Sequence, residues 1–146
     1  MQGYLNNPEA TAATIRPDGF MHTGDIGYFD DKGWLEITDR IKELIKYKGF
    51  QVAPAEIEAL INTLPGVADV VVIPVPDEAA GEIPRAYVVR AAGSTVTDND
   101  IEELVQTHLA PHKQLRGGVR FVDAVPRAAS GKLLRRKQIE LDRAAP

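Results

Sequence analysis

The segment that most constrains the fold is a run of β-branched residues, VADVVVIPV, at positions 67–75. A strand that is apolar on both faces is typical of a buried sheet, because neither face is suited to water. Two more strands are predicted by RAYVVRA, at residues 85–91, and by the shorter RFVDAVP, at residues 120–126. The chain is therefore expected to fold around a small sheet.

Three helices are predicted around these strands. The first is indicated by four apolar residues on one helical face, Ile57, Leu60, Ile61 and Leu64. The second begins at a capping box formed by Thr97 and Asp100. The third is the mostly polar KLLRRKQIELDR, at residues 132–143. From about residue 53 the predicted fold is therefore α+β, with a small three-stranded sheet packed with helices.

The first forty residues have a different character. NNPEATAATI predicts a short helix capped by Asn7, and DDKG, at residues 30–33, joins IGYF and WLEIT into a β-hairpin. Few apolar residues are present to cover this hairpin, and isolated hairpins are only marginally stable. We therefore interpret residues 1–39 as the end of a larger upstream domain and residues 40–146 as a separate C-terminal domain.

Composition argues against several classes of protein. The chain has no cysteine, so disulfides, thiol nucleophiles and cysteine-bound zinc are unavailable. Its 21 acidic residues against 17 basic ones argue against a nucleic-acid-binding protein. The three histidines are scattered and predict no metal site. No apolar run approaches the ~20 residues that span a bilayer, and no signal peptide opens the chain, so we expect a cytoplasmic protein.

Two short motifs carry residues with binding chemistry. In HTGD the carboxylate of Asp25 follows a glycine, where it could accept hydrogen bonds from a diol or cap local N–H groups. In SGK the backbone of Gly131 permits close approach, and Lys132 offers three donors on a long stem. Neither motif is specific alone, because a solvated basic run is the common alternative and the GxxxxGK[ST] phosphate loop is absent.

The stretch DRIKELIKYKGFQV, at residues 39–52, fits two alternatives. Its apolar residues suit a helix, but they also suit a strand on which Lys46 and Lys48 face away from Ile45 and Tyr47. On the strand alternative the chain turns at a glycine, where lysines could meet a phosphate or a carboxylate. A solvated strand face would show the same pattern.

Together these segments resemble one family. GYLNNPEAT, GFMHTGDIGYFDDKGW, TDRIKELIKYKGFQVAPAEIEALI, LRGGVRFVDAVP and SGKLLRRK are similar, in order and spacing, to the C-terminal part of the adenylate-forming enzymes. This family includes acyl- and aryl-CoA ligases, firefly luciferases and the adenylation domains of peptide synthetases. DRIKELIKYKGFQVAPAE is most similar to the branch of the 4-coumarate–CoA ligases and luciferases. One departure is Arg127, where the family often has lysine; the positive charge is kept.

The resemblance implies the C-terminal portion of an ATP-dependent, AMP-forming carboxylate–CoA ligase of the aryl (4-coumarate) or fatty-acyl type. A small carboxylic acid attacks the α-phosphorus of MgATP, which gives an acyl-adenylate and pyrophosphate, and the thiolate of CoA then attacks the acyl carbon. Between the steps the small domain turns about a hinge. ATP with its Mg²⁺ would be bound mainly by the N-terminal domain, whose phosphate loop is not in these residues, so we expect this chain to be inactive alone.

The resemblance also implies roles for individual residues. Lys132 matches the catalytic lysine that bridges carboxylate and phosphate oxygens during adenylation. Asp25 and Arg40 match residues that bind the nucleotide, and Lys42 matches the hinge. Lys46 and Gln51 match residues that contact the adenylate. Lys48 and Gly49 match the turn that lines the tunnel for the pantetheine arm of CoA.

Two alternatives stay open. A luciferase-type oxygenase would share the adenylation step and differ in an acyl pocket that these residues do not contain. A stand-alone module that binds CoA or a protein would keep the fold, but it would not need Asp25, Arg40 and Lys132.

Overall fold

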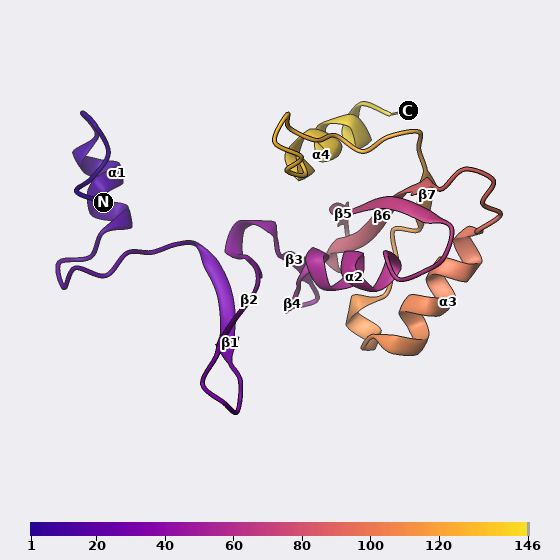
Figure 1. The fold of residues 1–146 in the computed structure, drawn as a ribbon, viewed down its shortest axis with the longest axis horizontal. Helices are drawn as coiled ribbons and strands as arrows, with labels where there is room; N and C mark the ends of the chain where they lie inside the picture. The colour runs from indigo at the N-terminus through magenta and orange to yellow at the C-terminus, as the bar shows by residue number, and fades with distance from the viewer. Residues whose placement is uncertain (146) are drawn as a thin grey trace. The chain divides into compact units, whose positions relative to one another are not determined.

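The computed structural model describes residues 1–145 and forms two compact units, Met1–Lys42 and Glu43–Pro146 (Figure 1). The division falls close to the boundary that we proposed at residue 39. That these units are parts of two domains of a larger protein stays a prediction.

The first unit contains the predicted helix and hairpin. Helix α1 (Pro8–Thr14) is capped by Asn7, whose side chain accepts a hydrogen bond from the Ala10 N–H at 2.9 Å. Strands β1 (Asp25–Phe29) and β2 (Leu35–Arg40) pair in antiparallel fashion. Several large apolar side chains of this unit are exposed, among them Phe20, Phe29, Trp34, Leu35 and Ile37.

The second unit is built on a sheet of order β4-β3-β6-β5, with β7 paired in parallel to β6. Its strands are β3 (Ile45–Tyr47), β4 (Phe50–Val52), β5 (Val67–Asp77), β6 (Gly81–Arg90) and β7 (Val119–Phe121). The three predicted strands are present, and the sheet gains two more from residues 39–52. Each added strand has three residues, which is too short for a clear alternating pattern in the sequence.

The β-branched run of β5 supplies two cores, one on each face of the sheet. Val70 and Val72 belong to a cluster that also contains residues of α2 (Pro54–Ile61) and α3 (Asp98–His108). Val71 and Ile73 belong to a second cluster, against which residue Ile139 of α4 (Arg135–Ala144) packs. Alternate residues therefore serve opposite faces, which explains why the run is apolar throughout.

Two helix boundaries differ from the prediction. Helix α2 ends at Ile61, so Leu64 packs on the core from the following turn. Helix α4 begins at Arg135 instead of residue 132. The residues before it are drawn into an extended segment, in which the Leu134 N–H donates to the Pro126 carbonyl at 2.9 Å. The capping box of α3 is confirmed.

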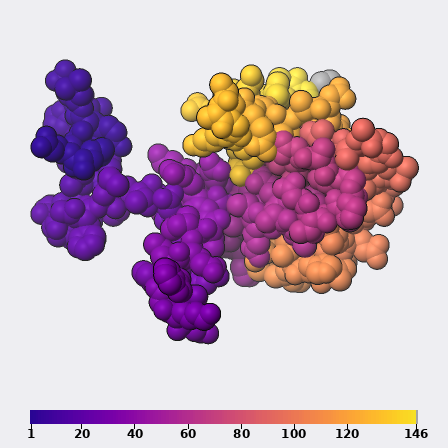
Figure 2. All heavy atoms as spheres, in the orientation of Figure 1, coloured from indigo at the N-terminus to yellow at the C-terminus, as the bar shows by residue number. Residues whose placement is uncertain are grey.

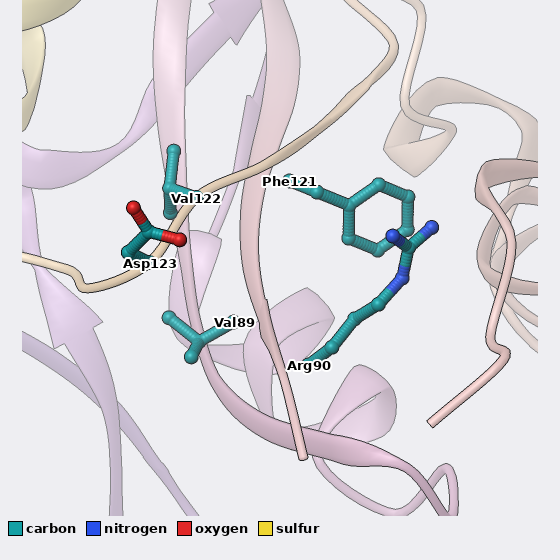
Figure 3. Close-up of a pocket in the computed structure, with 5 residues that line it drawn as sticks. All are labelled: Val89, Arg90, Phe121, Val122 and Asp123. Atoms are coloured by element: carbon teal, nitrogen blue, oxygen red, sulfur yellow. The ribbon is translucent and has the colours of Figure 1, made fainter. Parts of the chain in front are cut away.

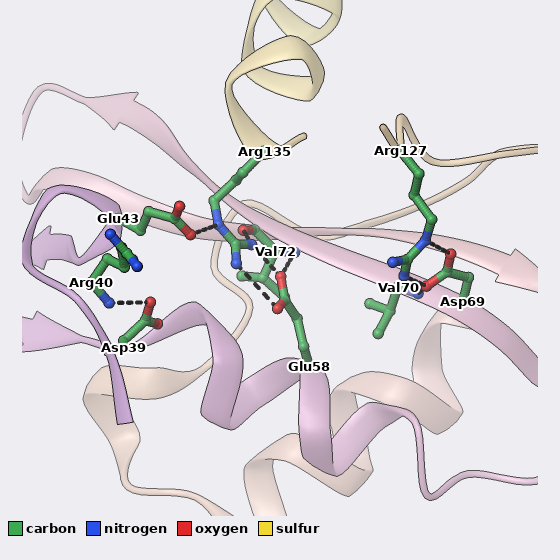
Figure 4. Close-up of polar contacts among 9 residues, drawn as sticks. All are labelled: Asp39, Arg40, Glu43, Glu58, Asp69, Val70, Val72, Arg127 and Arg135. Atoms are coloured by element: carbon green, nitrogen blue, oxygen red, sulfur yellow. Dashed lines mark hydrogen bonds and ion pairs between the residues drawn. The ribbon is translucent and has the colours of Figure 1, made fainter. Parts of the chain in front are cut away.

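Arg135, the first residue of α4, joins several elements of this unit (Figure 4). Its guanidinium pairs with Glu58 of α2, contacts Glu43 at 2.9 Å and donates to the Val72 carbonyl at 2.6 Å. The Val72 N–H donates to Glu58 at 2.7 Å. Burial alone would lower the pKa of Arg135, but its hydrogen bonds to the two carboxylates outweigh burial and raise the pKa.

No helix within residues 1–145 is both long and apolar enough to cross a membrane.

Changing Arg135 to methionine is expected to lower the free energy of unfolding by about 3–5 kcal/mol, because Glu58 would be left largely buried without its cation. The control is Arg136→Met, whose side chain is 94% exposed and lies 3.4 Å from Glu140. That change should stay within about 0.5 kcal/mol of the wild type. Urea unfolding followed by circular dichroism measures both, and equal small losses would contradict the role of Arg135.

Candidate functional site

The two residues that we predicted at the nucleotide lie opposite each other on the hairpin of the first unit. Asp25 opens β1, Arg40 closes β2, and the two are partners in the antiparallel register. Arg40 Nε lies 3.0 Å from Asp25 Oδ1, and the Arg40 side chain is 60% exposed. A carboxylate bound by one oxygen retains lone pairs for hydroxyl donors, and the adjacent guanidinium can meet a phosphate.

The predicted hinge residue, Lys42, lies in the 3₁₀ helix η1 (Ile41–Glu43) and is exposed. It is also the last residue of the first unit. Short 3₁₀ segments often serve as connectors between other elements. The role of Lys42 as a hinge stays a prediction.

The strand alternative is correct for residues 45–47, whereas Lys48, which was expected on the same strand, lies in the turn that follows. Ile45 and Tyr47 are buried, while Lys46 between them is exposed. Lys46 pairs in register with Gln51 of β4, so the two predicted adenylate contacts are neighbours on one hairpin. The backbone of Lys46 is held in place by an N–H that donates to Glu82 at 2.8 Å.

The hairpin turn consists of Lys48 and Gly49 alone. Their φ angles are 46° and 83°, the signature of a type I′ turn. A Cβ added at Gly49 would meet nothing within 4 Å, so glycine is required there by φ and not by space. The turn is anchored by the Lys48 N–H, which donates to the Ala80 carbonyl at 2.9 Å.

Two side chains that sequence reasoning did not assign to this site, His112 and Arg116, contact the aromatic residues that flank the turn. Phe50 stacks on His112 with ring centroids 4.6 Å apart. The Tyr47 ring lies close to two cations, with the Lys48 ammonium 5.7 Å and the Arg116 guanidinium 5.3 Å from the ring centroid. His112 and Arg116 are far from the turn in sequence and gave no signal of their own. The result is an exposed surface that combines positive charge with an aromatic stack.

The predicted catalytic lysine lies at the end of a tight, exposed loop. An isolated bridge between Arg127 and Leu133 closes the loop at its base. Within it, the Ala128 N–H donates to the Lys132 carbonyl and the Gly131 N–H donates to the Ala128 carbonyl, each at 2.8 Å. Gly131 has a φ of 81°, which accounts for glycine before the lysine. In Figure 2 this orange-to-yellow segment lies at the surface of the second unit.

The guanidinium of Arg127 connects the loop to strand β5 (Figure 4). It donates to both carboxylate oxygens of Asp69, at 2.8 and 2.7 Å, and to the Gly131 carbonyl at 2.7 Å. These hydrogen bonds lower the pKa of Asp69 and raise the pKa of Arg127. Sequence reasoning noted Arg127 only as a departure and missed Asp69, which stands inside an apolar strand pattern.

The structure thus places the predicted residues of the second unit on two separate loops. Lys46, Lys48, Gly49 and Gln51 share the β3–β4 hairpin, while Lys132 lies on the loop before α4. A hollow of about 530 Å³ is lined by Val89, Arg90, Phe121, Val122 and Asp123, and none of the predicted site residues lines it (Figure 3). The guanidinium of Arg90 lies 3.4 Å from the centroid of the Phe121 ring. Within residues 1–145 no three histidine, aspartate or glutamate side chains form a group suited to a metal ion.

Comparison with known proteins gives a consistent result. Residues 56–132 match the model of the AMP-binding enzyme C-terminal domain. The 4-coumarate–CoA ligase 2 of Nicotiana tabacum is 54% identical over 136 residues, which are 93% of this chain and 25% of that protein.

Two solved structures cover nearly the whole chain. ATP-bound MatB from Rhodopseudomonas palustris has a TM-score of 0.87 and 37% identity over 97% of this chain and 28% of its own. The o-succinylbenzoate CoA synthetase MenE from Bacillus subtilis, in complex with the acyl-adenylate OSB-AMP, has a TM-score of 0.86 and 33% identity over 94% of this chain and 28% of its own.

The Asp69–Arg127 pair is expected to make the free energy of unfolding fall at acidic pH. Because the folded pKa of Asp69 is lowered, the pair stabilises the fold above the unfolded aspartate pKa of about 3.9. This contribution is lost as the pH falls through the lower folded pKa. The stability difference between wild type and Asp69→Asn should therefore be constant above about pH 5 and shrink on further acidification. Urea unfolding at a series of pH values measures it, and a pH-independent difference would contradict the pairing.

Proposed function

Because the chain belongs to the family of AMP-binding enzyme C-terminal domains, we propose that it forms the C-terminal part of an ATP-dependent, AMP-forming carboxylate–CoA ligase. The chain spans 25% of the length of the tobacco ligase that it matches, so the activity of the whole protein is part of this proposal. We infer an aryl (4-coumarate) or fatty-acyl substrate and a cytoplasmic location. The observation that carries the proposal is a pair of separate exposed loops on one unit, each with a lysine beside a glycine of positive φ.

In the proposed first step, a carboxylate oxygen of the acid forms a bond to the α-phosphorus of ATP, and the bond to pyrophosphate breaks. The ammonium of Lys132 offsets the repulsion between the anionic acid and the phosphates. Asp25 accepts hydrogen bonds from the ribose hydroxyls, and Arg40 contacts the nucleotide. Lys46 and Gln51 contact the adenylate. Mg²⁺ enters with ATP and is bound mainly by the upstream domain.

In the proposed second step, the thiolate of CoA attacks the acyl carbon, and AMP leaves with the electrons of the broken bond. The turn at Lys48 and Gly49 lines the channel for the pantetheine arm. An I′ turn suits this role, because Gly49 lets the backbone come close to a narrow substrate. Rotation about Lys42 removes the loop of Lys132 from the active site and brings this turn to it.

The two alternative functions have less support. The Asp25–Arg40 ion pair and the exposed Lys132 favour nucleotide chemistry over a module that only binds CoA or a protein. No specific observation favours a luciferase-type oxygenase.

A hybrid ligase tests the proposal, with this chain replacing the matching segment of the tobacco enzyme. Lys132→Ala should slow ATP–pyrophosphate exchange by about 10²–10³-fold, the cost of one lost transition-state donor. Thioester formation from preformed acyl-adenylate and CoA should stay within a few-fold of the unaltered hybrid, because Lys132 has no part in that step. Lys137→Ala, at an exposed lysine on α4, is the control and should leave both rates unchanged. If Lys132→Ala slowed the two half-reactions by the same factor, the proposal would be wrong.

A further inference from the structure

The loop of Lys132 is tied to strand β5 by the side chain of Arg127, which makes three hydrogen bonds. Arg127 uses Nε and Nη2 to bind both oxygens of Asp69, and it uses Nη1 to bind the Gly131 carbonyl. The Gly131 carbonyl belongs to the peptide group that directly precedes Lys132. A continuous chain of hydrogen bonds therefore runs from strand β5 to the backbone of Lys132.

The shape of the guanidinium is what makes this arrangement possible. Its donors form a rigid, planar fork, so two of them can fix the plane against a carboxylate while a third is aimed at a carbonyl. A lysine at the same position would keep the charge, but its donors radiate from a single atom on a flexible stem. The contacts therefore depend on arginine and not merely on a cation.

We propose that Arg127 is a positioning residue for adenylation, which together with Asp69 holds the Gly131–Lys132 peptide so that the Lys132 side chain leaves the loop in one direction. This inference rests on the proposed function of Lys132. It adds that the backbone at Lys132 is already fixed before the substrates bind. Without these contacts, both the loop and the lysine side chain would have to be ordered at each turnover.

The pair lies outside the two hydrophobic cores, so its contribution to stability is expected to be local to the loop. The side chains of Arg127 and Asp69 are 42% and 26% exposed. Neither belongs to the two buried clusters of the unit. Their removal should therefore loosen the loop and leave the cores and the Arg135 contacts in place. It should affect the half-reaction that uses Lys132 and spare the one that does not.

The kinetic test uses the same hybrid ligase with Arg127→Gln, Asp69→Asn and Arg127→Lys. Arg127→Gln and Asp69→Asn should each slow ATP–pyrophosphate exchange by about 10- to 100-fold, the scale of a loss for a misplaced catalytic group. Thioester formation from preformed acyl-adenylate should change by less than about twofold, because Lys132 is not used. Arg127→Lys should restore exchange only in part. Arg143→Gln, at an exposed arginine on α4, is the matched control and should behave as the parent.

The structural test uses the 146-residue chain itself and amide hydrogen exchange followed by NMR. In Arg127→Gln the amides of Ala128 and Gly131, which close the loop, should exchange at least about tenfold faster than in the wild type. The amide of Val72, held by Glu58 on the same strand as Asp69, should be unchanged. Unchanged loop amides would overturn the inference whatever the kinetics show.

The outcomes separate this inference from the proposed function. If Lys132→Ala leaves exchange with pyrophosphate unaffected, the function proposed for the lysine fails, and the inference fails with it. If Lys132→Ala slows ATP–pyrophosphate exchange while Arg127→Gln keeps the rate of the unaltered hybrid, only the inference fails. Equal slowing of both half-reactions by Arg127→Gln would also overturn it, because that is the result expected of a purely structural residue. Selective loss of the first half-reaction, with faster exchange of the loop amides, supports it.

Discussion

The ion-paired guanidinium of Arg135 is the contact on which the arrangement of the second unit depends. Strand β5 lies at the edge of its sheet, and Val72 turns both backbone polar groups toward Arg135 and Glu58 instead of another strand. An edge strand without such partners would leave these groups open to other pairing. Because Arg135 also begins α4, the same contact fixes where the preceding loop ends. The loop is thus tied to β5 on both sides, by Arg127 at Asp69 and by Arg135 at Val72.

This arrangement allows one small unit to present two different chemical surfaces. The β3–β4 hairpin offers a rigid I′ turn beside cations and stacked rings, a suitable surface for a long substrate with phosphate groups. The loop before α4 offers one lysine on a short, hydrogen-bonded turn, which suits a single charge contact. The hairpin buries Ile45, Tyr47 and Val52 in the first core, and the loop before α4 is tied to strand β5 by Arg127. In the proposed ligase, stiffness within the unit would let a change at the hinge move each surface as a whole.

Much of the fold could be predicted from local patterns. The run at residues 67–75, the capping box at Thr97 and the hairpin turn at residues 30–33 each reflect an interaction between near neighbours in sequence. The resemblance to adenylate-forming enzymes singled out Lys132 and the turn at Gly49, whose roles stay predictions. The ties between distant residues could not be predicted in this way. Nothing in the sequence pairs Arg127 with Asp69, or Arg135 with Glu58, because charged residues are common on any surface and only the fold shows which of them meet.

In the proposed ligase, the second unit alternates between the two half-reactions by a change of backbone torsion at Lys42. This alternation is tested by comparing both half-reaction rates of the hybrid ligase with those of its Lys42→Pro variant, with Lys42→Ala as the control. Proline fixes φ near −65° and removes the N–H. Holding a residue in an unfavourable conformation costs about 1–3 kcal/mol, so the ratio of the two rates should shift by about tenfold or more. The alanine variant should keep the parental ratio. A proline variant that changes both rates by the same factor would contradict the account.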